Sequence, residues 1–237
     1  MSNHYFRFRQ FTIHQEHCAM KVSTDACIQG AWTPLAPAAK KVLDIGCGTG
    51  LLSLMIAQRQ PDLMIDALEI DTSAVQQAAE NVAASPWNNR IQVLHKDART
   101  HFDPEPYDMI ICNPPFFSGD LQAMNESRNR ARHDVSLSQA DLFNIISANL
   151  TAQGTACMML PVAAHALWEA LLTRQGWYIH QALAVRPSER KSVNRIISVA
   201  ASFPCPVRHD EELMIYDSAG VYTEPFRELL KPYYLYL

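Results

Sequence analysis

The sequence predicts an α/β fold in which a mostly parallel sheet, with an antiparallel strand at its edge, carries helices on both faces. From Lys41 onward, short apolar runs alternate with longer amphipathic segments, as they do in βαβ units. The chain has 237 residues, of which 48% are apolar and 19% charged. A chain of this size can bury about 70–75% of its unfolded surface, so it needs neither a metal nor a disulfide to fold.

Local patterns predict each element in turn. Apolar residues three and four positions apart indicate helices, and short apolar runs indicate strands. In chain order we expect strand 42–45, helix 51–58, strand 64–69, a helix through 84 after an N-cap at 71–73, strand 90–95, strand 107–112, helix 137–150, strand 155–160, helix 163–174, strand 178–185 and strand 196–203. A polar arm, not a helix, joins the last two strands, which predicts an antiparallel pair at the sheet edge.

Two segments fall outside the alternation. We interpret residues 1–40 as an N-terminal extension that packs on the active edge of the sheet, and residues 41–237 as the main domain. The tail over 222–237 is rich in aromatic and aliphatic residues, so we expect it to pack as a closing helix.

Composition restricts the class of protein. The net charge of −4 gives no global attraction for polyanions, so any nucleic acid must bind through local basic patches. The six cysteines form no C-x-x-C pair, which favours a reducing cytosol. No segment approaches the run of about 18 apolar residues that spans a bilayer, and no leader peptide is evident. We therefore expect a cytoplasmic protein.

A glycine-rich loop follows the first expected strand. Gly46, Gly48 and Gly50 are evenly spaced, unlike the G-x-G-x-x-G of nicotinamide dehydrogenases, and Asp44 precedes them on the strand. Glycines let backbone N–H groups approach a ligand at a helix N-terminus. A carboxylate at position 44 suits an ammonium group better than a pyrophosphate. The loop thus favours an amino-acid-like nucleoside such as S-adenosylmethionine.

Further acidic residues follow the next two strands. Glu69 lies 23 residues after Gly46, close to the interval at which a carboxylate reaches ribose hydroxyls. Asp97 and Ala98 come after the third strand, where Asp97 could accept a hydrogen bond from an adenine amine while Ile70 flanks the ring. Because carboxyl ends of parallel strands share one edge, we expect a single ligand crevice.

The tetrapeptide Asn113-Pro114-Pro115-Phe116 follows the fourth strand and predicts an acceptor site. Two prolines fix the backbone and leave carbonyls free to accept hydrogen bonds. The Asn113 side-chain oxygen and the Pro114 carbonyl can hold an aromatic amine for attack on a methyl group, and Phe116 offers a stacking face. Such an amine loses its proton only after it becomes positively charged, so no strong general base is needed. The histidines are dispersed, and we expect no metal.

The chain resembles a known family over nearly its whole length. The similar stretches are residues 18–25, 30–32, 44–50, 85–87, 90–91, 113–116 and 131–132, and the closing Tyr-Tyr-Leu-Tyr-Leu. They resemble the bacterial tRNA1(Val) (adenine-N6)-methyltransferases, which are class I S-adenosylmethionine-dependent enzymes with a Rossmann-like sheet. The resemblance implies methylation of the adenine 3′ of the anticodon, position 37 of a valine tRNA, with S-adenosylhomocysteine as product.

The resemblance also implies roles for residues near the N-terminus. Lys21 and Thr24-Asp25 would lie over the methionine end of the cofactor. The chain has Ser23 where the family usually has glycine, and Phe116 where tyrosine is common.

Basic residues flank the expected acceptor site and form a candidate surface for an anticodon stem-loop, whose loop nucleotides are easily splayed out. They are Arg7, Arg9, Arg128, Arg130, Arg132, Arg186, Arg190, Lys191 and Arg195. No membrane and no obligate protein partner are expected.

Other functions remain open from the sequence. The same acceptor tetrapeptide would serve an enzyme that methylates guanine-N2 of ribosomal RNA or a protein glutamine amide. A cofactor-binding RNA chaperone would have no need of that tetrapeptide. A nicotinamide dehydrogenase is disfavoured because no proton relay stands out.

Overall fold

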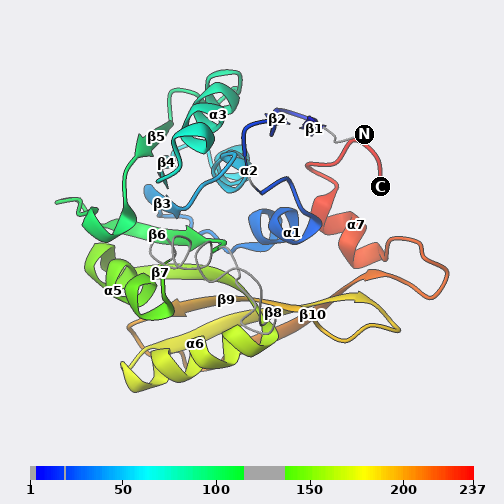
Figure 1. Ribbon diagram of the computed structural model, residues 1–237. Coiled ribbons are helices and arrows are strands. Elements are labelled where there is room, and N and C mark those ends of the chain that lie inside the picture. Colours follow the sequence, from blue (N-terminus) through cyan, green and yellow to red (C-terminus); the bar gives the residue numbers. More distant parts are fainter. Residues whose placement is uncertain (1–3, 19, 115–136) are drawn as a thin grey trace, which may run out of the picture.

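The computed structural model describes residues 4–18, 20–114 and 137–237. Its centre is an eight-stranded sheet with the order β10-β8-β9-β7-β6-β3-β4-β5 (Figure 1). The strands are β3 (Lys41–Ile45), β4 (Met64–Glu69), β5 (Ile91–His95), β6 (Tyr107–Cys112), β7 (Leu150–Pro161), β8 (Tyr178–Ser188), β9 (Arg195–Ala201) and β10 (His209–Tyr216). A separate two-stranded sheet joins β1 (Tyr5–Arg7) and β2 (Thr12–His14).

The predicted mostly parallel α/β sheet is confirmed, but the predicted position of its antiparallel strand at the edge is wrong. Strand β9 runs antiparallel to both β7 and β8, as expected of a pair joined without a helix. This antiparallel strand does not lie at the edge, because β10 pairs in parallel with β8 on the outside. Strand β10 was not predicted, because its acidic start over 209–212 obscures the apolar alternation that follows.

Helices cover both faces of the sheet (Figure 1). One face carries α1 (Thr24–Trp32), α2 (Leu51–Arg59), α3 (Thr72–Ala83) and α7 (Glu224–Leu230), and the other carries α5 (Gln139–Asn149) and α6 (Val162–Arg174). Each face has its own buried apolar cluster, because alternate residues of the strands point to opposite sides. None of the helices among the described residues is long and apolar enough to cross a bilayer.

Local capping explains where the helices begin. Asp71 accepts a hydrogen bond from the backbone N–H of Ala74 at the start of α3, which confirms the predicted N-cap. Ser138 and Asp141 form a reciprocal capping box at α5. Ser23 caps α1, a helix that the sequence analysis left unassigned within the first 40 residues. The expected closing helix of the tail is confirmed as α7.

Aromatic rings join the two ends of the chain beside α7. Tyr222 stacks on Phe226, and Phe226 meets Tyr234 edge-on. Tyr234 contacts Phe8 at a centroid distance of 6.0 Å, and a β-bridge joins the backbones of the same two residues. The tail is therefore packed, and it holds the residues near the N-terminus against the helical layer that contains α1.

Close packing of α1 on α2 depends on Gly30. A β-carbon at this position would lie 2.7 Å from the Sδ atom and 3.0 Å from the Cβ atom of Met55 in α2. The Gly30 carbonyl also accepts a hydrogen bond from Arg59 Nη1 at 3.2 Å. The missing side chain thus sets the distance between the two helices.

We expect Gly30→Ala to lower the free energy of unfolding by about 1–3 kcal/mol, because the added methyl group overpacks the contact with Met55. Urea denaturation of the variant and the wild type measures the difference. Ser73→Ala, at an exposed position of α3, is the control and should change little. Equal stability of the Gly30 variant and the wild type would show that the two helices can separate freely.

Candidate active site

Four parallel strands bring the predicted cofactor and acceptor residues to one edge of the sheet. Ile45 of β3 is level with Leu68 of β4 and with Cys112 of β6, and Glu69 of β4 is level with His95 of β5. The loops that follow these strands therefore leave the sheet at the same edge, as the sequence analysis expected.

The glycine loop adopts backbone angles that require glycine. Gly46, Gly48 and Gly50 have φ values of 70°, 56° and 80°, in the left-handed region that other residues rarely adopt. No heavy atom lies within 4 Å of a β-carbon built at Gly46 or Gly48. The backbone of the loop is thus open to a closely approaching ligand, and Gly50 caps α2.

Glu69 fastens the glycine loop to the end of β4. One carboxylate oxygen accepts a hydrogen bond from the backbone N–H of Gly48 at 2.9 Å, and the other accepts from the backbone N–H groups of Ile70 and Asp71. The oxygen that accepts from Gly48 retains a lone pair for a further donor, whereas the other oxygen already accepts two hydrogen bonds. The Ile70 side chain is exposed beside it and can flank a planar ring.

Asp44 is a fully buried acid at the end of β3. Its Oδ2 atom accepts a hydrogen bond from Ser53 Oγ at 2.7 Å, whereas its Oδ1 atom has no hydrogen-bond partner among the described residues. Burial raises the pKa of this carboxyl from 3.8 to about 7, against the lowering effect of Ser53. A buried acceptor without a donor is costly, so the site suits a ligand that brings a donor or a positive charge.

After β5, Asp97 has a local partner. It caps the short 3-10 helix η1 (Ala98–Thr100) and forms an ion pair with Arg99, with 2.7 Å between Arg99 Nη2 and Asp97 Oδ2. The hydrogen bonds from Arg99 lower the pKa of Asp97. The Ala98 side chain is buried in the core beside α5.

The structure describes the first two residues of the proposed acceptor tetrapeptide. Asn113 is half-buried directly after β6, and Pro114 is buried. The Asn113 Oδ1 atom is buried without a hydrogen-bond partner among the described residues. Pro115 and Phe116 lie outside those residues, as do Arg128, Arg130 and Arg132. Within the described ranges, no three His, Cys, Asp or Glu side chains form a group suited to a metal.

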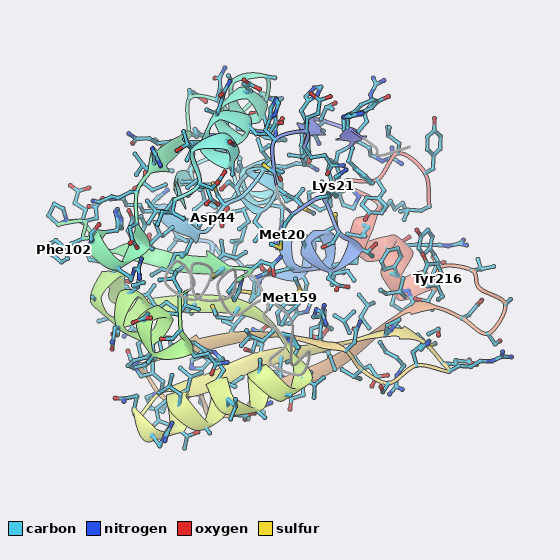
Figure 2. All side chains as sticks on the ribbon, in the orientation of Figure 1. Met20, Lys21, Asp44, Phe102, Met159 and Tyr216 are labelled. Carbon is cyan, nitrogen blue, oxygen red and sulfur yellow. The ribbon has the colours of Figure 1, made fainter. Side chains whose placement is uncertain are left out.

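The N-terminal motif forms the start of α1. Lys21 is exposed on the segment that leads into the helix (Figure 2). Thr24 is the first helical residue, and its side chain hydrogen-bonds to the Tyr234 hydroxyl of the tail. Asp25 lies 3.4 Å from Arg195 Nε at the start of β9. The motif is thus attached both to the tail and to the polar arm.

The other candidate RNA-binding cations divide into two groups. Arg9 donates to the Tyr234 carbonyl, and Arg186 pairs with Glu212 of β10. Arg7, Arg190 and Lys191 are exposed, and no ion pair engages them within the described residues. The second group therefore keeps its charge available to a phosphate.

Some residues that shape the site were absent from the sequence prediction. Ser53 holds Asp44, and Asn81 of α3 donates to the carbonyls of His14 and Thr49, which joins β2 to the glycine loop. Ser53 is a lone polar residue on an apolar helix face, and Asn81 shares the buried face of α3 with Gln77, so polar residues at buried helix positions are a signal that could have found them. Arg90, one of the residues that carry the family resemblance, is structural: it donates to three carbonyls at and beyond the end of α2.

Comparison with known proteins agrees with this geometry. Residues 31–156 match the family model "Methyltransferase small domain". The tRNA1(Val) (adenine(37)-N6)-methyltransferase of Dyadobacter fermentans is 42% identical over 98% of this chain and 98% of its own. The chain belongs to this family. The enzyme of the same name from Tolumonas auensis is 40% identical over 99% of this chain and 98% of its own.

Solved structures of other proteins have a fold similar to that of this chain. A predicted O-methyltransferase from Agrobacterium tumefaciens has a TM-score of 0.66 at 16% identity and covers 88% of this chain and 96% of its own. A putative RNA methyltransferase from Pyrococcus horikoshii has a TM-score of 0.56 at 18% identity and covers 79% of this chain and 88% of its own. These likenesses support the class I methyltransferase fold.

We expect Asp44→Asn to gain stability relative to the wild type as the pH rises from about 5 to 7.5. The folded protein keeps a proton on Asp44 that the unfolded chain releases above about pH 4, so the wild type loses stability over this window. The slope of this stability difference against pH should be at most about 1.4 kcal/mol per pH unit. Urea denaturation at several pH values measures it.

Ser73→Ala, which removes no titratable group, is the control for this titration. Its difference from the wild type should stay nearly constant with pH. A constant difference for Asp44→Asn as well would mean that Asp44 is already ionised in the folded protein.

Proposed function

We propose that this protein transfers the methyl group of S-adenosylmethionine to the N6 atom of adenine 37 in a valine tRNA. The observation that carries the proposal is the match along 98% of the chain to the tRNA1(Val) (adenine(37)-N6)-methyltransferase of Dyadobacter fermentans. The residues at the carboxyl edge of the sheet are suited to this chemistry.

The residues at the edge fit the proposed cofactor. The unpartnered Asp44 Oδ1 suits the ammonium group of the methionine end. Gly46 and Gly48 leave room for close approach, Gly50 completes the turn as the N-cap of α2, and Glu69 and Ile70 suit the ribose and one face of the adenine. Asp97 and Ala98 would complete the adenine side of the site. A hydrogen bond from Arg99 orients the Asp97 carboxylate. When bound, S-adenosylmethionine supplies a methyl group on a positively charged sulfur.

The N-terminal motif completes this proposed cofactor site. Lys21 and Thr24 belong to the segment at the start of α1, and we assign them to the methionine end. Thr24 is positioned by Tyr234. We also propose the division into residues 1–40 as an extension over the active edge and 41–237 as the methyltransferase domain. The hydrogen bonds of Asn81 to His14 and Thr49 support this placement of the extension.

Asn113, Pro114, Pro115 and Phe116 would form the acceptor site. The Asn113 Oδ1 atom and the Pro114 carbonyl accept hydrogen bonds from the target amine and keep its lone pair directed at the methyl group. As the new N–C bond forms, the C–S bond breaks, and the amine proton leaves to solvent or a nearby acceptor. Phe116 offers a ring on which the adenine can stack. Positioning supplies the rate enhancement, and we assign no role to a metal.

We propose that the anticodon stem-loop binds along the cations near this edge. The candidates are Arg7, Arg9, Arg128, Arg130, Arg132, Arg186, Arg190, Lys191 and Arg195. Arg190 and Lys191, in the turn between β8 and β9, are exposed, and neither forms an ion pair with a described residue. We further propose that the protein acts in the cytoplasm, without a membrane and without an obligate protein partner.

Transfer of labelled methyl groups to tRNA from a strain that lacks this gene tests the proposal. Nucleoside analysis should find N6-methyladenosine, and mapping should place it at position 37 of a valine tRNA. Transfer to ribosomal RNA or to a protein glutamine, with none to tRNA, would overturn the substrate.

We expect Asn113→Ala to lower kcat by about 100-fold or more, because it removes an acceptor that orients the amine. The affinity for S-adenosylmethionine should change little. Steady-state kinetics and calorimetry separate the two effects. Asn144→Ala, on the exposed side of α5, is the control. A collapse of cofactor affinity with unchanged kcat would contradict the assignment of Asn113 to the acceptor.

We expect the double variant Arg190→Glu, Lys191→Glu to weaken tRNA binding and to reduce the salt slope of log K by about 1–2, since two phosphate contacts are lost. Filter binding at several salt concentrations measures both. Lys40→Glu with Arg174→Glu makes the same charge change at the opposite edge of the sheet, where β3 and β8 begin. Equal effects of the two double variants would mean that net charge, and not the arm, governs binding.

A further inference from the structure

A glutamine from the N-terminal helix contacts the backbone just before the proposed acceptor site. Gln29 of α1 is fully buried, with 0% of its surface exposed. Its side-chain Nε2 donates a hydrogen bond to the carbonyl of Cys112 at 3.0 Å. Cys112 is the last residue of β6, and Asn113 follows it directly. The amide thus holds the peptide group whose nitrogen belongs to Asn113.

Cys112 is paired with β3 and β7, but the turn that follows it has few backbone donors. Pro114 and Pro115 have no backbone N–H, so the two residues after Asn113 cannot donate the hydrogen bonds that normally fix a turn. A side-chain donor from another element can supply the missing restraint. Gln29 is such a donor, and its position one helical turn after Asp25 relates it to the N-terminal motif.

The helix that carries Gln29 is itself firmly held. Ser23 caps its first turn, and Asp25 pairs with Arg195. At the other end, Thr33 Oγ1 lies 3.2 Å from the Cys157 sulfur of β7, and Arg59 donates to the Thr33 carbonyl at 2.6 Å. A side chain on such a helix has a fixed position, so it can hold the group that it contacts in place.

We propose that Gln29 is a positioning residue for methyl transfer. It fixes the orientation of the Cys112–Asn113 peptide group and thereby the direction of the Asn113 side chain. The inference rests on the proposed function, because it assigns Asn113 to the target amine. It makes the N-terminal helix part of the acceptor side of the site. The Oε1 atom of Gln29 is buried and has no hydrogen-bond partner among the described residues, so the side chain acts as a donor. It donates to the Cys112 carbonyl of β6, and a hydrogen bond from it also lowers the pKa of the neighbouring Cys157 thiol of β7.

Gln29→Leu tests the proposal, since it keeps the size of the side chain and removes the donor. We expect kcat to fall about 10- to 100-fold, as for a misplaced reacting group, with the KM and Kd for S-adenosylmethionine nearly unchanged. Thr33→Val is the matched control: it removes the buried hydroxyl of the α1 C-cap, which donates to the backbone carbonyl of Gln29 and contacts Cys157 of β7, and it leaves the side-chain donor to Cys112 in place. Its kcat should stay near that of the wild type.

Gln29→Glu supplies a second test, because the pH dependence of its kcat would not change if Gln29 only filled space in the core. A glutamic acid can donate to the Cys112 carbonyl only when protonated, and burial favours that form. Its kcat relative to the wild type should therefore rise as the pH falls from about 8.5 to 6, while the ratio for Gln29→Leu stays low. The nearby thiols of Cys112 and Cys157 have pKa values raised by burial, so they stay neutral over this range.

Other charged groups around this position are Asp44, Glu69, Asp25 with Arg195, and Arg59, and expressing each rate relative to the wild type removes their shared titration. Equal kcat losses for Gln29→Leu and Thr33→Val, or a flat ratio for Gln29→Glu, would overturn the proposal. The wild-type assay on tRNA separates this result from failure of the proposed function, because it does not depend on the variants.

Discussion

The burial of Asp44 at the end of β3 is the constraint on which the rest of the site depends. The strand lies between β4 and β6, so the carboxyl cannot leave the interior without breaking the parallel ladder. Water is excluded, Ser53 supplies one donor, and Oδ1 has none within the part of the chain that the structure describes. A cationic ligand would relieve this cost, which explains why an acid is tolerated in a core position. The open glycine loop, fastened by Glu69, lies directly after it.

The two ends of the chain together fix the position of α1. Phe8, Tyr234 and Phe226 bring the tail against the N-terminal segment, and Thr24 and Cys27 of α1 hydrogen-bond with the Tyr234 side chain. Packing of Gly30 on Met55 then sets how closely α1 approaches α2. The position of α1 is therefore fixed by residues more than 200 positions apart. Through Gln29 it reaches the end of β6, where the proposed acceptor begins.

Much of this arrangement could be predicted from local pattern. Met64–Glu69 and Tyr107–Cys112 have the predicted bounds, because each is a short, mainly apolar run of the kind that a largely buried strand carries. Asp44 and the three glycines were recognised from their spacing on a strand-to-helix turn. The position of β10 was missed because its first four residues are polar and its partner β8 is distant in sequence.

The roles of Gln29, Ser53 and Arg90 were also missed, for a different reason. Each acts through a contact with a residue far along the chain or across a helix, and a single sequence shows only which residues are polar. Asp97 illustrates the converse: its place after β5 was predicted, whereas its pairing with Arg99 depends on the fold of η1.

The most direct test of the central claim counts the protons released when the ligand binds Asp44. Calorimetry of S-adenosylmethionine binding at about pH 6.5, in buffers of different ionisation enthalpy, gives this number, and an α-amino group is already protonated at that pH. The account predicts release of more than about half a proton, because the ligand's charge ionises a carboxyl whose pKa is about 7. Methylthioadenosine, which lacks the amino-acid part, and the Asp44→Asn variant should both release almost none. Equal proton release in all three measurements would contradict the claim that Asp44 holds the cationic end of the cofactor.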